Sequence, residues 1–209
     1  MGEPSRAGVT DPVEEVLDLF ADRGDGYFGE AVDQRRHALQ SAARARSAGA
    51  PDHLVTAALL HDIGHLLSDT GDATATGDGR HEAVGARWLA PRFGPEVAGP
   101  VALHVLAKRY RCAVDVSYVE ALTPASIDSL RLQGGPLDAT GAARFNSHPG
   151  AHHALLLREW DEGAKDPDVD TDDFEAFVGC LEYTVVRRRG RVSASSGLPG
   201  LRVRRQRDD

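Results

Sequence analysis

The sequence has few cysteines, no long apolar run and no apolar leader. Its two cysteines, Cys112 and Cys180, lie far apart with no Cys-x-x-Cys spacing, so neither a disulfide framework nor a zinc–cysteine cluster is indicated. No apolar stretch approaches the length of a membrane span. The segment Met1–Arg6 has no apolar signal region, and Arg6 stands where the myristoylation pattern requires Ser or Thr. We therefore expect a cytoplasmic protein with no membrane partner.

The sequence also has fewer positively than negatively charged residues. The formal net charge of −8 at pH 7 argues against nucleic acid as the general partner. A chain of 209 residues is long enough to bury most of a core within one domain. We expect this domain to span residues 1–190. Residues 191–209 are basic and low in large apolar side chains, which is typical of a disordered tail.

The sequence lacks internal repeats and the alternating pattern of amphipathic strands. Apolar residues recur instead with a helical period from Asp11-Pro12 onward, which predicts an all-α fold. After the first helix, we expect further helices over Ala31–Ala48, from Asp52 through the pair His61-Asp62, and over Arg80–Phe93, Pro95–Arg111, Ser126–Leu132, Ala139–Asn146, Ala151–Lys165 and Phe174–Arg188. The composition of Asp69–Gly79 predicts a loop, and Val114–Val116 is expected to be a short extended segment.

Side chains suited to binding metal recur along the chain in one order. They are His37, the adjacent pair His61-Asp62, His81, His104 and Asp161. Neutral imidazole and carboxylate suit borderline divalent metals such as Fe, Mn and Zn. Six protein ligands exceed what one tetrahedral ion needs, but they suit two neighbouring ions with the carboxylate of Asp62 between them. The sequence therefore favours a dinuclear metal enzyme.

Each of these residues also has a simpler interpretation. A single histidine is more often a packed core residue, as His37 and His104 could be, and Asp161 could lie at a solvated helix end. The pair His61-Asp62 is different because it follows the apolar run Ala57–Leu60, and a buried carboxylate needs a charge partner. The other ligand assignments depend on that pair.

Three spacings indicate an anion-binding site beside the metals. Lys108 lies one helical turn after His104, and Arg158 lies three residues before Asp161. Ser126 and Gln133 are seven residues apart, so a helix would present a hydroxyl and an amide in one direction. The alternative is ordinary surface charge, because Lys and Arg on helices are usually solvated.

The pattern His…His-Asp…His…His…Asp resembles the HD-domain superfamily of metal-dependent helical proteins. Most members hydrolyse phosphate esters, and a minority are mixed-valent di-iron oxygenases. The part of the chain from Gly26 to Lys165 is similar specifically to the HD-domain phosphonate oxygenases. The segments that carry this similarity are Tyr27–Glu30, His37–Gln40, Leu60–His65, His81–Ala86, His104–Tyr110, Ser126–Leu130, Gln133–Pro136 and Arg158–Glu162.

The resemblance implies an HD-domain helical bundle with a di-metal site in its core. The cofactors it implies are two Fe ions, mixed-valent Fe(II)/Fe(III), and O2 is the implied co-substrate. His37, His61 and Asp161 would hold one iron. His81 and His104 would hold the other, and Asp62 would bridge the two.

The resemblance also implies roles in binding and turnover. Tyr27 and Glu30 would form a lid that leaves the metal and closes over the substrate. The phosphonate would be held by His65, Lys108, Ser126, Gln133 and Arg158. The substrate would be a small hydroxyphosphonate such as 2-amino-1-hydroxyethylphosphonate. Oxygen insertion at C1 would break the C–P bond and release phosphate and a carboxylate such as glycine.

Several alternatives remain open at the level of sequence. The same ligands could activate water in a metal-dependent phosphohydrolase that acts on a nucleotide or phosphate monoester. A non-catalytic sensor module is disfavoured because the ligand series is complete. Glu30 is a plausible partner for a substrate ammonium, which favours an amine-bearing substrate, although a lid carboxylate could also cap the metal. The oligomeric state is left open.

Overall fold

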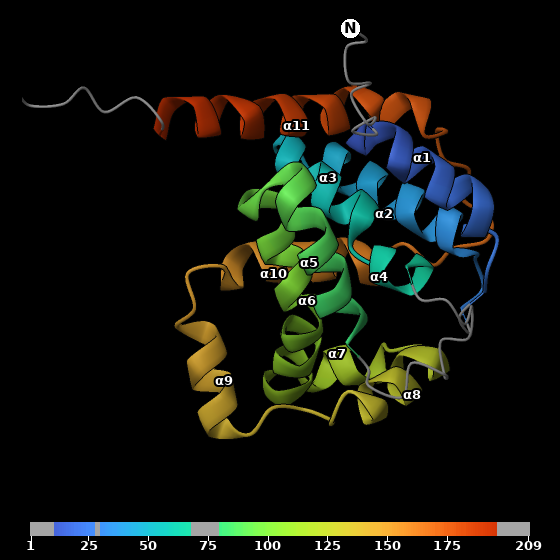
Figure 1. Cartoon of the computed structure of the whole chain (residues 1–209). Helices are drawn as coiled ribbons and strands as arrows, with labels where there is room; N and C mark the ends of the chain where they lie inside the picture. The colour runs from blue at the N-terminus through green and yellow to red at the C-terminus, as the bar shows by residue number, and fades with distance from the viewer. Residues whose placement is uncertain (1–10, 28–29, 68–79, 196–209) are drawn as a thin grey trace, which may run out of the picture.

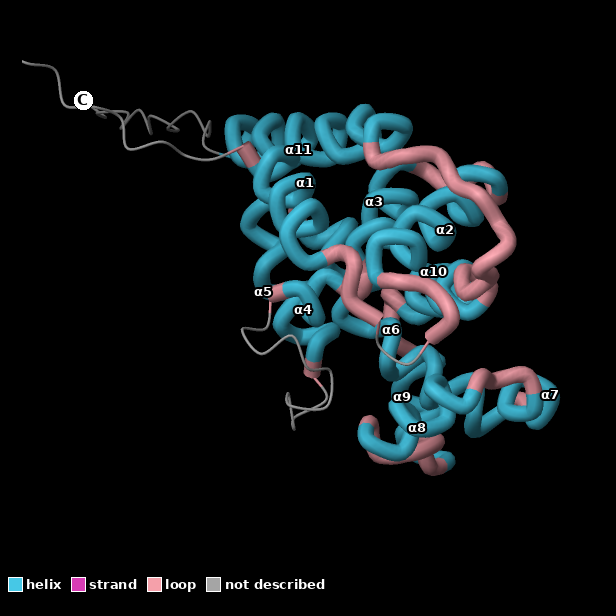
Figure 2. The backbone as a smooth tube through the Cα atoms, turned by 90° about the vertical axis from the view of Figure 1, so that its right-hand side faces the viewer, coloured by secondary structure: helices cyan, strands magenta, loops and turns pink. Residues whose placement is uncertain are grey.

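The fold was analysed in a computed structural model that describes residues 11–27, 30–67 and 80–195, with side chains up to residue 185. Within these ranges all regular secondary structure is helical, which confirms the all-α prediction (Figures 1 and 2). The helices are α1 (Pro12–Arg23), α2 (Gln34–Ser47), α3 (Asp52–Leu60), α4 (Ile63–Leu66), α5 (His81–Phe93), α6 (Pro95–Val114), α7 (Val116–Glu120), α8 (Pro124–Leu132), α9 (Ala139–Asn146), α10 (Ala151–Glu162) and α11 (Glu175–Ser195).

Side-chain caps set where several helices begin. The carboxylate of Asp11 accepts a hydrogen bond from the backbone N–H of Val13 at the start of α1. Asp33 caps α2 through the N–H of Arg36, so α2 starts three residues later than the apolar pattern suggested. Helix α10 ends at Glu162 rather than at residue 165, and α11 continues to Ser195, beyond the expected end at residue 188.

The pair His61-Asp62 lies at a break between two helices, and the prediction of one continuous helix through it was wrong. Helix α3 ends at Leu60, Asp62 has φ −98° and ψ 9°, and α4 begins at the next residue. Gly64 makes a close approach possible here, because a Cβ at this position would lie 2.0 Å from the backbone oxygen of His81. The short helix α4 therefore packs directly against the first residue of α5.

The expected extended segment at Val114–Val116 was also wrong. Val114 is the last residue of α6 and Val116 is the first residue of α7. Only Asp115 between them is extended, and its side chain accepts from the N–H of Tyr118 to cap α7. A single capping residue therefore turns the chain from one helix into the next.

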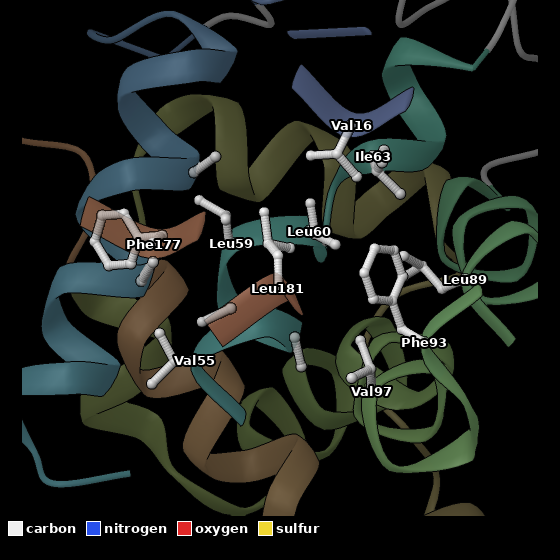
Figure 3. Packing of buried hydrophobic residues seen from close by; sticks show 14 of the residues in the cluster. Val16, Val55, Leu59, Leu60, Ile63, Leu89, Phe93, Val97, Phe177 and Leu181 are labelled. Carbon is white, nitrogen blue, oxygen red and sulfur yellow. The ribbon is translucent and has the colours of Figure 1, made fainter. Parts of the chain in front are cut away.

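The main hydrophobic core lies between α3 and the helices around it. Figure 3 shows Leu60 of α3 packed among side chains from α1, α5 and α11, including Val16, Phe93 and Leu181. Helix α6 packs against α3, α5 and α10 and extends beyond this core. Helices α7, α8 and α9 gather around its far end, away from α11 (Figures 1 and 2).

A smaller apolar cluster of Tyr118, Leu122 and Leu130 holds α7 and α8 together at that end. No helix within the described ranges is both long enough and apolar enough to cross a membrane. The loop expected at Asp69–Gly79 and the part of the expected tail beyond Ser195 lie outside the described residues.

Candidate metal centre

Five separate elements bring the six proposed ligands together. His37 comes from α2, His61 from the end of α3, His81 from the first position of α5 and His104 from the middle of α6. Asp161 lies in the last turn of α10, and Asp62 follows His61 at the helix break. His37, His61, His104 and Asp161 are buried, and Asp62 and His81 are half-buried.

Three of these side chains converge on one point. The Nε2 atoms of His37 and His61 lie 3.2 Å apart. The two carboxylate oxygens of Asp161 lie 3.3 Å from Nε2 of His37 and 3.7 Å from Nε2 of His61. The grouping matches one of the two ligand sets expected from the resemblance.

A second pair of histidines lies beside the first group, and Asp62 lies between them. The Nε2 atoms of His81 and His104 are 3.0 Å apart. Oδ1 of Asp62 lies 3.4 Å from Nε2 of His81 and 3.5 Å from Nε2 of His104. Its other oxygen, Oδ2, lies 3.5 Å from Nε2 of His61 and 3.8 Å from Nε2 of His37. One carboxylate thus offers one oxygen to each histidine pair.

The tautomers of these histidines fit a bound cation. Nδ1 of His37 donates to the backbone carbonyl of Ala164 at 2.8 Å. Nδ1 of His61 and of His104 likewise donate to carbonyls in the preceding turn, at 2.9 and 2.8 Å. Because a carbonyl only accepts, Nδ1 carries the proton and Nε2 of the neutral ring has a lone pair. Lone pairs that face each other at about 3 Å suit two ligands bound about 2 Å from one metal ion.

The charges of the cluster lead to the same conclusion. Burial disfavours protonation of His61, but the carboxylates of Asp62 and Asp161 outweigh it and raise its pKa to about 9. Burial alone would raise the pKa values of both carboxylates, yet the neighbouring cations, His61 at Asp62 and Arg158 with His61 at Asp161, hold them well below their usual range. The negative charge that keeps a proton on His61 is the charge that attracts a metal ion.

His65 lies next to the second histidine pair. Its ring stacks on that of His81 with centroids 4.0 Å apart. Burial and the neighbouring His81 lower the pKa of His65 to about 3, so its imidazole stays neutral. Asp62, His65 and His81 also offer ligand atoms that all lie within 4.8 Å of one another. His65 is therefore placed either to bind a ligand beside the metals or to join their coordination.

Lys108 is a buried cation close to the cluster. Its Nζ donates to Oγ of Ser129 at 2.5 Å, and no carboxylate lies within ion-pair distance of it among the described residues. Burial and the positive charges of Arg158 and Lys165 lower its pKa to about 7. Oε1 of Gln133, at the end of α8, is likewise buried without a hydrogen-bond partner in the described part of the chain.

Arg158 contacts three neighbouring side chains through its guanidinium. Its two Nη atoms donate to Asp161 and Glu162, and its Nε donates to the hydroxyl of Tyr118 at 2.8 Å. Asp161 and Tyr118 raise the pKa of the guanidinium although burial opposes this. Arg158 therefore contacts a proposed metal ligand directly, whereas its spacing from Asp161 in the sequence had indicated a cation for an anion beside the metals.

Ser126 and Glu30 meet at α8, but Tyr27 does not join them. Oγ of Ser126 donates to Oε1 of Glu30 at 3.3 Å and accepts from Nζ of Lys165 at 2.6 Å. The side chain of Tyr27 is 66% exposed, so this conformation does not bury it over the cluster. The structure thus brings together all the proposed metal ligands, His65, Lys108, Arg158, Ser126 and Glu30, and leaves Tyr27 at the surface.

Sequence reasoning missed four residues of this network. They are Tyr118, Ser129, Glu162 and Lys165. A signal existed for two of them: Ser129 lies one turn after Ser126, and Lys165 lies four residues after Asp161. The second spacing does not act through a shared helix face, because α10 ends at Glu162 and Lys165 reaches Ser126 of α8 from the segment that follows.

Comparison with known proteins agrees with this geometry. Residues 35–128 match the model of the HD domain. The chain is 42% identical to hydroxymethylphosphonate dioxygenase of Gimesia maris over 82% of this chain and 89% of the relative. It is 39% identical to [1-hydroxy-2-(trimethylamino)ethyl]phosphonate dioxygenase (glycine-betaine-forming) of Leisingera caerulea over 85% of this chain and 92% of that relative. The chain belongs to the family of HD-domain phosphonate dioxygenases.

Proposed function

We propose that this protein is an oxygen-dependent oxidoreductase that cleaves the carbon–phosphorus bond of a small 1-hydroxyphosphonate. Two relatives, 42% and 39% identical, are named dioxygenases of hydroxyphosphonates. The observation that carries the proposal is the carboxylate of Asp62 between two pairs of facing histidine nitrogens, with a buried lysine nearby. Such a site suits two adjacent cations and an anionic ligand beside them.

The proposed reaction balances without any other co-substrate. The hydroxyphosphonate reacts with one O2, and the C–P bond and a C1–H bond break. C1 gains one oxygen atom and becomes a carboxylate, and phosphorus gains the other and leaves as phosphate. Carbon is oxidised, O2 is reduced, and one proton is released to solvent.

We propose two iron ions per chain in a mixed-valent Fe(II)/Fe(III) state. His37, His61 and Asp161 would hold one ion, His81 and His104 the other, with Asp62 bridging them. When bound, the ions supply Lewis acidity toward the substrate hydroxyl and redox chemistry toward O2. Because the same ligands suit Mn and Zn, metal analysis and low-temperature EPR of the mildly reduced protein are needed to test this assignment. A single zinc with no mixed-valent signal would contradict it.

The phosphonate group is proposed to bind among the side chains that face the cluster from α4, α6, α8 and α10. Lys108 would contribute an ammonium that no carboxylate of the described chain pairs with. Each Nη of Arg158 has a second N–H beyond the one that contacts a carboxylate. Ser126 and Gln133 would add neutral polar contacts, and His65 a neutral ring.

Tyr27 and Glu30 are proposed to form a lid over the bound substrate. Glu30 already reaches α8 through Thr123 and Ser126, whereas Tyr27 is exposed. Closure would move Tyr27 inward and exclude water from the reacting carbon. A closed lid would also limit the escape of reactive oxygen species from the site.

Dependence on oxygen is the decisive test of this function. Iron-loaded protein should release phosphate from hydroxymethylphosphonate or 2-amino-1-hydroxyethylphosphonate in air and stop under argon. A phosphohydrolase would use the same ligands to activate water and would need no oxygen. Turnover of a generic phosphate monoester under argon at a useful rate, with no oxygen-dependent release from either phosphonate, would favour that alternative.

We further propose that residues 1–190 form one domain followed by a basic tail, and that the protein acts in the cytoplasm without nucleic acid as a partner. The two cysteines, Cys112 and Cys180, lie far apart in the sequence without a Cys-x-x-Cys spacing, which supports a reducing compartment. The net charge of −8 supports a small anion held by local cations rather than a polyanion. Limited proteolysis of the full chain would test the domain boundary.

A further inference from the structure

Glu30 is held by three donors on a single oxygen. Its Oε1 accepts from Nζ of Lys165 at 3.0 Å, from Oγ1 of Thr123 at 3.1 Å and from Oγ of Ser126 at 3.3 Å. Its side chain is only 19% exposed. The carboxylate of Glu30 therefore has a cationic partner inside the protein and two hydroxyl partners on and before α8.

Lys165 is saturated by the same group of residues. Besides Glu30, its Nζ donates to Oγ of Ser126 at 2.6 Å and to Oε1 of Glu162 at 3.2 Å. Three acceptors match the three N–H bonds of an ammonium. Lys165 and Lys108 are the only lysines in the sequence, and every other long cationic side chain is an arginine. Each of the two contacts a serine of α8, and those serines are one helical turn apart.

The charges around Glu30 are balanced without a substrate. The second oxygen of Glu162 accepts from Arg158, which also donates to Asp161, so the three carboxylates Glu30, Glu162 and Asp161 face the two cations Lys165 and Arg158. Lys108 adds a further positive centre on this side. A cationic group placed next to Glu30 would meet Lys165 at close range, and juxtaposed like charges are unfavourable.

We infer that Lys165 is a specificity-determining residue which neutralises Glu30, so that the site takes hydroxyphosphonates with an uncharged C1 substituent, hydrogen or a small alkyl group. Substrates with an aminomethyl or trimethylammoniomethyl group are disfavoured because the carboxylate of Glu30 is already paired with the ammonium of Lys165. This inference rests on the proposed function. It replaces the expectation, drawn from the sequence alone, that Glu30 pairs with a substrate ammonium.

The first test uses the iron-loaded wild-type protein and needs no variant. Phosphate release in air is compared for hydroxymethylphosphonate, 1-hydroxypropylphosphonate and 2-amino-1-hydroxyethylphosphonate, the last two with matched configuration at C1. Their C1 substituents, ethyl and aminomethyl, have the same number of heavy atoms, so this pair separates charge from size. We expect kcat/KM for the aminated member of the pair to be lower by about tenfold or more. Equal or better turnover of the aminated substrate would overturn the inference, whereas no release from any of the three would overturn the proposed function instead.

The second test asks whether Lys165 is the cause. Lys165→Met removes the charge at similar size and leaves the carboxylate of Glu30 uncompensated, whereas Lys165→Arg retains the charge as a matched control. The ratio of kcat/KM for 2-amino-1-hydroxyethylphosphonate to kcat/KM for its uncharged counterpart should rise by about tenfold in Lys165→Met. In Lys165→Arg this ratio should stay near the wild-type value. An unchanged ratio in metal-loaded Lys165→Met would contradict the inference.

Calorimetric titration of the same two phosphonates under argon measures affinity without turnover. It should show the same rise in relative affinity for the aminated phosphonate in Lys165→Met. If that variant does not fold, the wild-type comparison still decides whether the site rejects a cationic substituent.

Discussion

At the scale of single residues, the hydrogen bonds of the histidine rings fix which ring nitrogen is available to a metal ion. In His37, His61 and His104, Nδ1–H donates to a backbone carbonyl, so the Nε2 lone pair is directed at the cluster. Asp62 then supplies one oxygen to each pair of histidines. A carboxylate shared in this way makes the two halves of the site depend on each other.

This dependence predicts different outcomes for two substitutions. Asp62→Ala removes an oxygen from both groups and should lose both ions. His104→Ala removes a ligand from one group only and should retain about one ion, held by His37, His61 and Asp161. Metal analysis of the purified variants, with circular dichroism to check folding, distinguishes them. Two ions retained in Asp62→Ala would show that this carboxylate is not the bridge.

Lys108 predicts a pH dependence of substrate binding. Because burial and neighbouring cations lower its pKa to about 7, the ammonium is charged below this pH and loses its proton above it. A phosphonate needs the charged form, so KM should rise as pH increases through 7. The loss of one charge-assisted contact, ~1.5–3 kcal/mol, corresponds to roughly ten- to a hundredfold.

Lys108→Arg is the matched control for this titration. A guanidinium stays charged across the same range, so KM of this variant should vary much less above pH 7. Steady-state kinetics between pH 6 and 9 would measure both profiles. Parallel profiles in wild type and Lys108→Arg would assign the pH dependence to another group.

At the scale of secondary-structure elements, the helices and the turns between them determine which side chains come into contact. The order of histidine and aspartate residues along the chain predicted a cluster of possible metal ligands, and the structure brings these side chains together. The break after His61 was not predictable from apolar periodicity, since it depends on the contact between Gly64 and the backbone of His81. Lys165 was missed for a similar reason: it follows the end of α10 and reaches α8 through tertiary packing.

The contact at Gly64 can be tested by adding one methyl group. In Gly64→Ala the Cβ would overlap the backbone oxygen of His81, so α4 or the start of α5 must shift. We expect a loss of roughly 1–3 kcal/mol in the free energy of unfolding and weaker metal binding through the displaced His81. Denaturant unfolding and metal titration would measure the two effects.

Gly99→Ala serves as the control for that substitution. Gly99 lies within α6, and an added Cβ there meets no atom within 4 Å. Alanine should therefore raise stability by roughly 0.5–1 kcal/mol through its better helix propensity. Similar losses in both variants would mean that the close approach at Gly64 is not what the glycine provides.

The last turn of α10 lies between the proposed metal centre and the proposed anion site. Arg158 donates to Asp161, a proposed ligand, as well as to Glu162 and Tyr118. Arg158→Ala removes the guanidinium from buried Asp161, whereas Glu162 keeps Lys165 as a partner, and loss of one member of a buried ion pair is strongly destabilising. We expect it to lower metal content as well as substrate affinity, whereas Lys108→Ala should lower affinity alone. Full metal content in Arg158→Ala would contradict this coupling.

At the scale of the whole molecule, helices that are distant in the sequence meet at the candidate metal centre. The ligands come from α2, α3, α5, α6 and α10, and α6 links the main core to the helices at its far end (Figure 1). The sequence indicated one domain from its length, but it did not show that the buried carboxylates depend on these contacts. Without a metal ion, repulsion between Asp62 and Asp161 is offset only by neighbouring protonated or cationic groups.

Removal of metal should therefore destabilise the whole fold. A ligand that binds only the native state at 100 times its Kd adds about 2.7 kcal/mol, which for a chain of this length corresponds to a rise in Tm of about 5–10 °C. Calorimetry of the iron-loaded protein before and after chelation should show this difference in a single transition, because five helices share the centre. The same chelator should leave the Tm of Asp62→Ala unchanged if that variant holds no metal. An equal shift in both proteins would mean that the stabilising ion is bound elsewhere.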